Sequence, residues 1–145
     1  MNTSLFTRVC LFDSERFRTF QKRFRKCSLF YNLKMKKNYE KFFHEAMLAS
    51  VKSQHPRFKH GSVVVHRNSI VGRGANAGWT HAEVSGLLNI ENIKKKCISV
   101  FVVRVNCSGE FRNSRPCERC HAYMKKMGVS RVFYSTDRGF EKMIL

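Results

Sequence analysis

The sequence is poor in acidic residues. Ten Asp and Glu stand against 28 Lys and Arg, and the formal net charge is +18 at pH 7. A field of that sign favours polyanions over cationic partners: RNA, DNA, nucleotides or an anionic membrane surface. Charge alone does not discriminate among these, and many basic proteins have no such partner. The imbalance therefore makes a nucleic-acid partner a hypothesis and no more.

Long apolar runs are also absent. The longest strongly apolar stretch covers residues 98–103, which is the length of a strand and far from the roughly 20 residues of a membrane helix. No secretory signal opens the chain, since Arg8 interrupts the apolar residues 6–12. We therefore expect no transmembrane segment and an intracellular, cytoplasmic location. In a reducing compartment, a Cys-x-x-Cys pair indicates a metal or redox site before a structural disulfide.

Internal repeats and low-complexity segments are missing as well. The 145 residues suffice for one domain with a substantial core and are too few for two. Hydrophobic residues make up 43% and charged residues 26%, which is the balance of an ordinary globular protein. Wholesale disorder is therefore excluded.

Residues 1–37 differ from the rest in composition. They contain ten Lys and Arg against Asp13 and Glu15, and Phe17, Phe20 and Phe24 share one helical face. A basic amphipathic arm that contacts nucleic acid or a membrane surface fits this pattern, as does an organelle-targeting segment, although the acidic residues weaken the latter. We prefer a poorly ordered N-terminal extension, followed by one domain over residues 38–145.

Within residues 38–145, helical and strand patterns alternate. Apolar periodicity, caps and turn residues predict helices over 38–51, 81–89 and 117–127, and strands over 62–66, 70–74, 98–105 and 132–135. A polar loop covers 106–116, and the tail from Thr136 is too short to assign. This order predicts a three-layer α/β domain in which helices cover a central mixed sheet.

Two short segments carry the residue types of a metal site. One is His81-Ala82-Glu83, and the other is Pro116-Cys117-Glu118-Arg119-Cys120. Cys117 and Cys120 are spaced i, i+3 at a helix start, so both sulfurs can reach one point, and the positive end of the helix favours thiolate. His81 begins the preceding helix. Either segment is weak evidence alone, whereas together they supply three zinc ligands.

Three protein ligands leave a fourth position for water, as in catalytic zinc sites. Zinc lowers the pKa of bound water to about 7 and so supplies hydroxide at neutral pH. Glu83 follows His81 by two residues and can reach this water without being a ligand. We therefore predict one catalytic Zn²⁺ per chain, with Glu83 moving the protons.

The combination of His-Ala-Glu with Pro-Cys-x-x-Cys resembles the cytidine and deoxycytidylate deaminase superfamily. The resemblance runs from Asn38 to Ser135. It includes residues 59–65, which are similar to the family's first strand, and residues 127–134, which are similar to its turn from helix to strand. It implies a cytidine-deaminase-like α-β-α domain and zinc-dependent hydrolytic deamination of a cytosine-type base in a nucleoside or nucleotide.

The resemblance also points to substrate contacts. In the family, an Asn in the loop before the His often binds the substrate sugar, and Asn76 is the matching residue. Arg115 precedes Pro116, where relatives have small or apolar residues, and would meet a phosphate or point to solvent. Trp79 would stack on a base or cover the edge of the core. We expect His121 to be no ligand and Cys97 to be a buried thiol.

Several alternatives stay open. The substrate is a free nucleoside or nucleotide, or else cytosine or adenine within RNA or DNA, in which case the base must be single-stranded or flipped out. A nucleic-acid-binding module with a structural zinc closed by Cys97 or Cys107 is a different class, against which Glu83 argues. A thiol oxidoreductase using Cys117 and Cys120 is disfavoured by the His-Ala-Glu segment. A homo-oligomer is also considered, since the family often assembles.

Overall fold

A computed structural model describes residues 37–90 and 97–145 of the chain. The N-terminal extension predicted for residues 1–37 lies outside these residues, apart from Lys37 at the start of the first described helix. None of the described helices is long and apolar enough to cross a membrane.

The centre of the domain is a six-stranded sheet with the order β2-β1-β3-β5-β6, and β4 pairs with β3 outside this path. Only β3 and β5 pair in parallel; the other pairs are antiparallel. The mixed sheet predicted from the sequence is therefore confirmed. The strands are β1 (Lys59–His66), β2 (Ser69–Ala75), β3 (Ile98–Val105), β4 (Phe111–Arg112), β5 (Val129–Thr136) and β6 (Gly139–Ile144).

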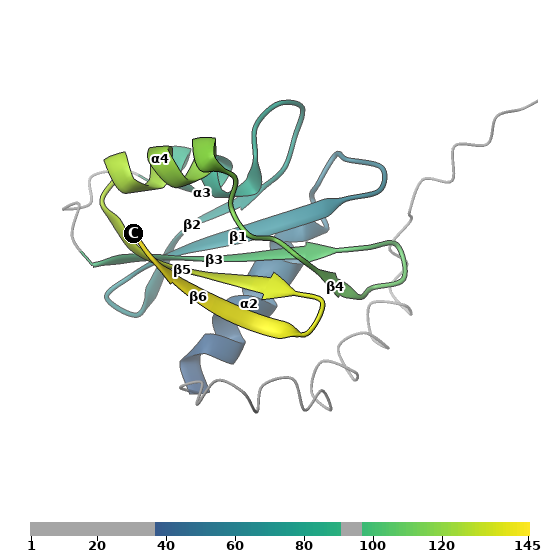
Figure 1. Cartoon of the computed structure of the whole chain (residues 1–145), viewed down its shortest axis with the longest axis horizontal. Helices are drawn as coiled ribbons and strands as arrows, with labels where there is room; N and C mark the ends of the chain where they lie inside the picture. Colours follow the sequence, from purple (N-terminus) through teal and green to yellow (C-terminus); the bar gives the residue numbers. More distant parts are fainter. Residues whose placement is uncertain (1–36, 91–96) are drawn as a thin grey trace, which may run out of the picture.

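Helices cover both faces of this sheet (Figure 1). Helix α2 (Lys37–Ser50) lies on one face, and α3 (Ala82–Leu88) and α4 (Glu118–Lys126) lie on the other. Alternation along β3 supplies both cores: Phe101 and Val103 pack on the α2 side, whereas Val100 and Val102 pack on the side of α3 and α4. The predicted three-layer α/β architecture is confirmed.

Strands β4 and β6 lie where the sequence pattern predicted none, and β4 has only two residues. Strand β6 pairs antiparallel with β5 through a tight turn, in which Thr136 is the register partner of Gly139. Its sequence carries Glu141 and Lys142 at exposed positions, and Phe140 is its only buried large apolar side chain. An edge strand that faces water on one side has little apolar signal, which is why the tail could not be assigned.

Helix α3 approaches the sheet closely because glycines face each other. A methyl group added at Gly74 on β2 would come well under 3.0 Å from backbone atoms of Gly86 and Ala82 in α3. The hydroxyl of Ser62 on β1 donates to the carbonyl of Ala82 at 2.7 Å. Both contacts fix the first turn of α3, which follows His81 and contains Glu83.

We expect Gly74→Ala to lower the free energy of unfolding by about 3 kcal/mol, because the new methyl meets immovable backbone. Gly78→Ala is the matched control. Gly78 has open space around it and a φ of +56°, so it should cost only about 1 kcal/mol of backbone strain. Urea unfolding of both variants measures the difference, and equal losses would contradict a close contact between β2 and α3.

Candidate metal and catalytic site

The two sequence motifs meet at the starts of α3 and α4. His81 is the N-cap residue of α3 and Cys117 is that of α4, both with extended backbone. Residues at this position usually bind the helix end through a side-chain oxygen, but neither side chain here makes a capping hydrogen bond. Both side chains are therefore available to a common ligand.

The ligand atoms have spacings that suit a tetrahedral ion. His81 Nδ1 lies 3.2 Å from Cys120 Sγ and 3.6 Å from Cys117 Sγ, and the three atoms all lie within 4.8 Å of one another. Zinc bonds of about 2.0–2.3 Å in tetrahedral geometry place ligand atoms about 3.3–3.8 Å apart. The structure thus brings His81, Cys117 and Cys120 together in an arrangement that fits zinc.

The described residues offer no fourth protein ligand beside these three. Across residues 37–90 and 97–145, no other His, Cys, Asp or Glu belongs to the group. Cys97 and Cys107, the candidates for a closed structural site, are therefore not members of it. Cys97 is also exposed, contrary to the expectation of a buried thiol, because it precedes β3 with a φ of +59° rather than lying within the strand. Three ligands leave a position for water.

Glu83 lies in the first turn of α3 and is only 3% exposed. Its Oε2 is buried and has no hydrogen-bond partner. Burial raises the pKa of Glu83, although a backbone hydrogen bond and the charge of His81 act in the opposite direction. An unpartnered buried carboxylate oxygen two residues from a ligand is costly, and a water on a metal held by the three ligands would supply the missing partner.

Cys120 is the buried member of this His/Cys/Cys group, at 3% exposure. Burial raises the pKa of its thiol, and the neighbouring Glu83 and Cys117 raise it further. Without a metal ion, burial of Cys120 thus opposes the thiolate form that the helix start was expected to favour. A metal ion must displace this proton to bind, so metal binding and thiol ionisation are linked.

Two buried serines that the sequence pattern did not single out hold the loop before Cys117. The Ser114 hydroxyl donates to the carbonyl of Val102 on β3 at 2.9 Å and accepts from the Ser135 N–H at 2.9 Å. The Ser135 hydroxyl donates to the carbonyl of Arg112 at 2.8 Å. These bonds anchor residues 112–114 to β3 and β5 and so set where α4 begins. No local pattern marks serines that act through distant strands.

Asn76 lies just after β2, and its side chain is engaged with the loop between α2 and β1. Its Oδ1 accepts from the Ser53 hydroxyl and, at 2.9 Å, from the His60 N–H. Its Nδ2 donates to the carbonyl of Phe58 at 2.9 Å. One N–H of the amide is left for another acceptor, so binding of a substrate oxygen stays a prediction.

Trp79 and Arg115 are both exposed, and in the sequence each is two residues before a member of the His/Cys/Cys group. Trp79 is 102% exposed, at the tip of a turn closed by reciprocal hydrogen bonds of 3.1 and 3.0 Å between Ala77 and Thr80. The interpretation that Trp79 covers the edge of the core is therefore wrong. Arg115 is exposed on the loop before Pro116. Contacts of both residues with substrate stay predictions, and His121 is not part of the ligand group.

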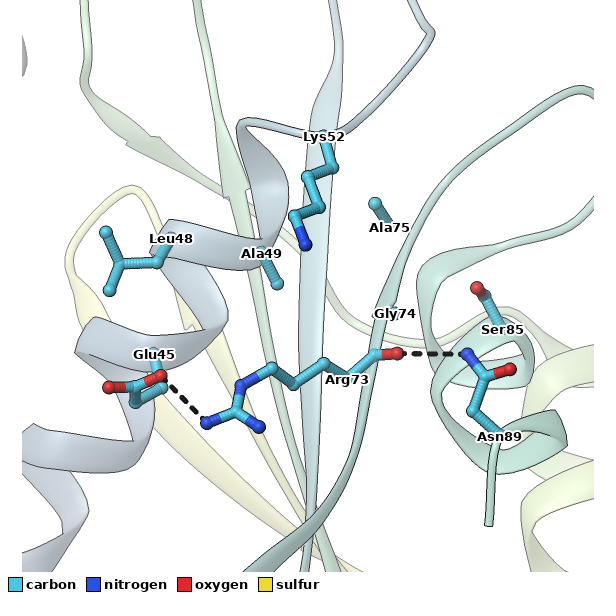
Figure 2. Close-up of a pocket in the computed structure, with 9 residues that line it drawn as sticks. All are labelled: Glu45, Leu48, Ala49, Lys52, Arg73, Gly74, Ala75, Ser85 and Asn89. Carbon is cyan, nitrogen blue, oxygen red and sulfur yellow. Dashed lines mark hydrogen bonds and ion pairs between the residues drawn. The ribbon is translucent and has the colours of Figure 1, made fainter. Parts of the chain in front are cut away.

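A cavity of about 440 Å³ lies elsewhere, between α2, β2 and α3 (Figure 2). Arg73 crosses it to form an ion pair of 3.2 Å with Glu45, and Asn89 Nδ2 donates to the Arg73 carbonyl at 3.3 Å. None of the predicted site residues lines this cavity. The candidate chemistry is therefore concentrated at the starts of α3 and α4.

The sequence pattern of the cytidine and deoxycytidylate deaminase zinc-binding region matches residues 36–136. The chain belongs to this deaminase family. The match covers both motifs, so the His/Cys/Cys group lies within the part of the chain that matches the zinc-binding region of this family. None of the curated proteins is significantly similar in sequence to this deaminase-family chain.

Solved structures confirm the deaminase fold. The dCMP deaminase of cyanophage S-TIM5 in its apo form is 23% identical, with a TM-score of 0.53 over 69% of this chain and 84% of that one. The same enzyme in complex with dCMP and dUMP gives 23% identity and a TM-score of 0.55, covering 69% of this chain and 82% of that one. RibD of Acinetobacter baumannii is 21% identical, with a TM-score of 0.51 over 68% of this chain and 28% of that one.

Proposed function

We propose that this deaminase-family chain removes the exocyclic amine of a cytosine-type base in a nucleoside or nucleotide by hydrolysis. The site lies within a domain formed by residues 38–145. The observation that carries the proposal is the buried, unpartnered Oε2 of Glu83 beside a group of three zinc-type ligands. A closed structural zinc site has no use for such a carboxylate. The similarity to a dCMP deaminase solved with dCMP and dUMP supports the choice of cytosine.

In this proposal His81, Cys117 and Cys120 hold one Zn²⁺, which when bound supplies a water of lowered pKa as the nucleophile. Glu83 accepts a proton from that water on its carboxylate. It delivers this proton to the ring nitrogen, then takes a second proton from the hydroxyl group that has added to the ring carbon. It passes that proton to the amine as the carbon–nitrogen bond breaks, so that one carboxyl group serves alternately as base and as acid. Burial of Glu83 excludes bulk water from the transfer and raises its pKa towards the working pH.

Ammonia release by the zinc-loaded protein tests the proposal. The panel contains cytidine, deoxycytidine, their monophosphates, adenosine, and single-stranded DNA and RNA, and zinc per chain is measured on the same sample. We expect one zinc per chain and turnover of a cytosine substrate. A protein that carries zinc but releases ammonia from nothing on the panel would contradict the assignment, whereas turnover of adenosine alone would correct the base.

Deamination of a base within RNA or DNA is the second candidate. A fully exposed Trp79 two residues before a metal ligand favours it, since aromatic side chains stack on single-stranded bases, and the net charge of +18 adds to it. A salt titration separates the two candidates. Binding of a strand should weaken steeply as salt rises, because many counterions are released, whereas binding of a mononucleotide should change little.

The pH profile of kcat/KM follows from Glu83. The carboxyl must be ionised to accept a proton, and burial raises its pKa above the ordinary value of 4.5. Activity should therefore fall as the pH drops through a value above 4.5, rather than at the usual carboxylate range. Initial rates between pH 4 and pH 9 measure this acidic limb. Zinc per chain is measured at each pH, so that loss of the metal is separated from protonation of Glu83, and circular dichroism checks that the fold persists. An acidic limb at or below 4.5 would contradict the role of Glu83 as the base.

A further inference from the structure

Arg104 occupies an unusual place in the sheet. It is the penultimate residue of β3 and is the register partner of His60 on β1 and of Arg112 on β4. Val103 and Val105 point to the α2 side, so alternation places Arg104 on the opposite face, the one that α3 and α4 cover. The proposed metal ligands lie at the starts of those two helices. Figure 1 shows both helices on this face of the sheet.

The guanidinium of Arg104 has no anionic partner in the part of the chain that the structure describes. Its Cζ lies 4.2 Å from the centroid of the Phe58 ring, and its Nε is buried without a hydrogen bond. Two other arginines, both with solvent-exposed side chains, are paired: Arg73 with Glu45 at 3.2 Å, and Arg112 with Glu110 at 2.8 Å. A half-buried arginine with an unsatisfied N–H is costly unless an acceptor binds it.

His60 connects Arg104 to the metal ligands. It lies beside Arg104 in the sheet, and its pKa is lowered to about 4 by burial and by the positive charges of Arg104 and His81. The side chains of Arg104 and His81 therefore both lie close to the imidazole of His60, which is neutral at pH 7. The guanidinium thus lies on the same face of the sheet as the proposed active site, beside an imidazole that is also close to His81.

We propose that Arg104 binds a phosphate group of the substrate. The proposal rests on the proposed deaminase function, since it names the substrate class as phosphorylated. A guanidinium is planar and can donate two parallel hydrogen bonds to phosphate oxygens, and stacking on Phe58 restrains the plane before the anion arrives. The phosphate is either the monoester of a free nucleotide or a diester of a nucleic-acid strand, since both present the same oxygens.

A purely structural role for Arg104, clamping Phe58, makes a different prediction. Such a role would affect phosphorylated and unphosphorylated ligands alike, whereas phosphate binding is selective. The decisive comparison is therefore between a nucleotide and its own nucleoside, which differ only in the phosphate.

The test uses the full-length, zinc-loaded protein and Arg104→Met, which keeps an extended apolar side chain over Phe58. Calorimetry measures the Kd of uridine, UMP and dUMP as reaction products, and of a short single-stranded oligodeoxyuridylate. We expect Arg104→Met to weaken binding of phosphorylated ligands roughly ten- to a hundredfold, the range for losing a charged hydrogen bond. Uridine should change by less than about twofold. The Kd values of Arg104→Lys for phosphorylated ligands should lie between those of the wild type and Arg104→Met. An ammonium keeps the charge but cannot form the two parallel hydrogen bonds of a guanidinium.

Arg131→Met is the matched control. Arg131 is exposed on β5, paired in register with Ser99 near the start of β3 and thus away from the end that carries Arg104. It removes the same charge and should leave every Kd unchanged. Selective loss on UMP and dUMP identifies a nucleotide monoester as the source, and selective loss on the oligonucleotide alone identifies a diester.

Equal losses on uridine and UMP, or no loss on any ligand, would overturn the proposal. So would a wild-type protein that binds no phosphorylated ligand more tightly than uridine. Absence of turnover on every cytosine substrate counts against the deaminase function instead, while the binding comparison still decides the role of Arg104.

Discussion

Replacing Glu83 with glutamine should lower the rate of deamination by roughly 10²–10⁴-fold while one zinc per chain is retained. The amide keeps the shape of the side chain but can neither accept the proton of water nor deliver it to the leaving amine. Ammonia release under saturating substrate, together with metal analysis of the same sample, measures both quantities. Glu118→Gln is the control, because Glu118 is an exposed carboxylate in the first turn of α4.

The same substitution should stabilise the metal-free protein. The folded-state pKa of Glu83 is raised by burial, so the native state favours the protonated carboxyl, and wild-type stability declines as the pH rises from 4.5 through the raised pKa. Glutamine is neutral throughout. The melting temperature of Glu83→Gln should therefore exceed that of the wild type at neutral pH, and the two should converge towards pH 4. A less stable variant at pH 7 would contradict a buried carboxylate without a partner.

Replacing Cys117 with alanine should remove zinc and activity together. Its sulfur lies 3.6 Å from His81 Nδ1, and its side chain is exposed, so the substitution opens no core cavity. We expect zinc affinity to fall by more than about a hundredfold, beyond the 10–100-fold typical of changes to the partners of ligands. Competition with a chromogenic chelator measures the affinity. Cys97→Ala, at an exposed thiol outside the group, should retain zinc, and loss in both variants would contradict the ligand set.

Zinc affinity should also depend steeply on pH. The pKa of Cys120 is raised by burial in the metal-free protein, so each metal that binds must release the thiol proton. Affinity should therefore weaken as the pH falls from 8 to 5, and zinc binding in weak buffer should acidify the solution. Chelator competition at several pH values measures this, and a pH-independent affinity would argue against Cys120 as a thiolate ligand.

The elements near the motifs could be predicted from the sequence to within a few residues. The helix expected over 117–127 is observed over Glu118–Lys126, and the buried strand over 98–105 has the predicted bounds. Both have strong local signals: a glycine after the helix and an unbroken apolar run in the strand. Strands β4 and β6 were missed because β4 has two residues and β6 carries charges on its exposed face.

Site residues that depend on long-range contacts were the ones that local patterns could not show. Ser114 and Ser135 are 21 positions apart and meet only because the loop before Cys117 lies against β5. The exposure of Trp79 depended on whether the turn from Ala77 to Thr80 points at the core or at solvent, and no local pattern decides that direction.

Residue types and spacing were sufficient to predict the alternation of helices and strands and to select the three residues that meet at the helix starts, His81, Cys117 and Cys120. The roles of these residues as zinc ligands and of Glu83 in proton transfer stay predictions. Ligand chemistry and periodicity are local properties and are visible along the chain. Strand register was needed to place Arg104 beside His60 on the face of the metal site, and burial was needed to raise the pKa values of Glu83 and Cys120. Register and desolvation arise only when segments distant in sequence pack together, so they belong to the folded molecule.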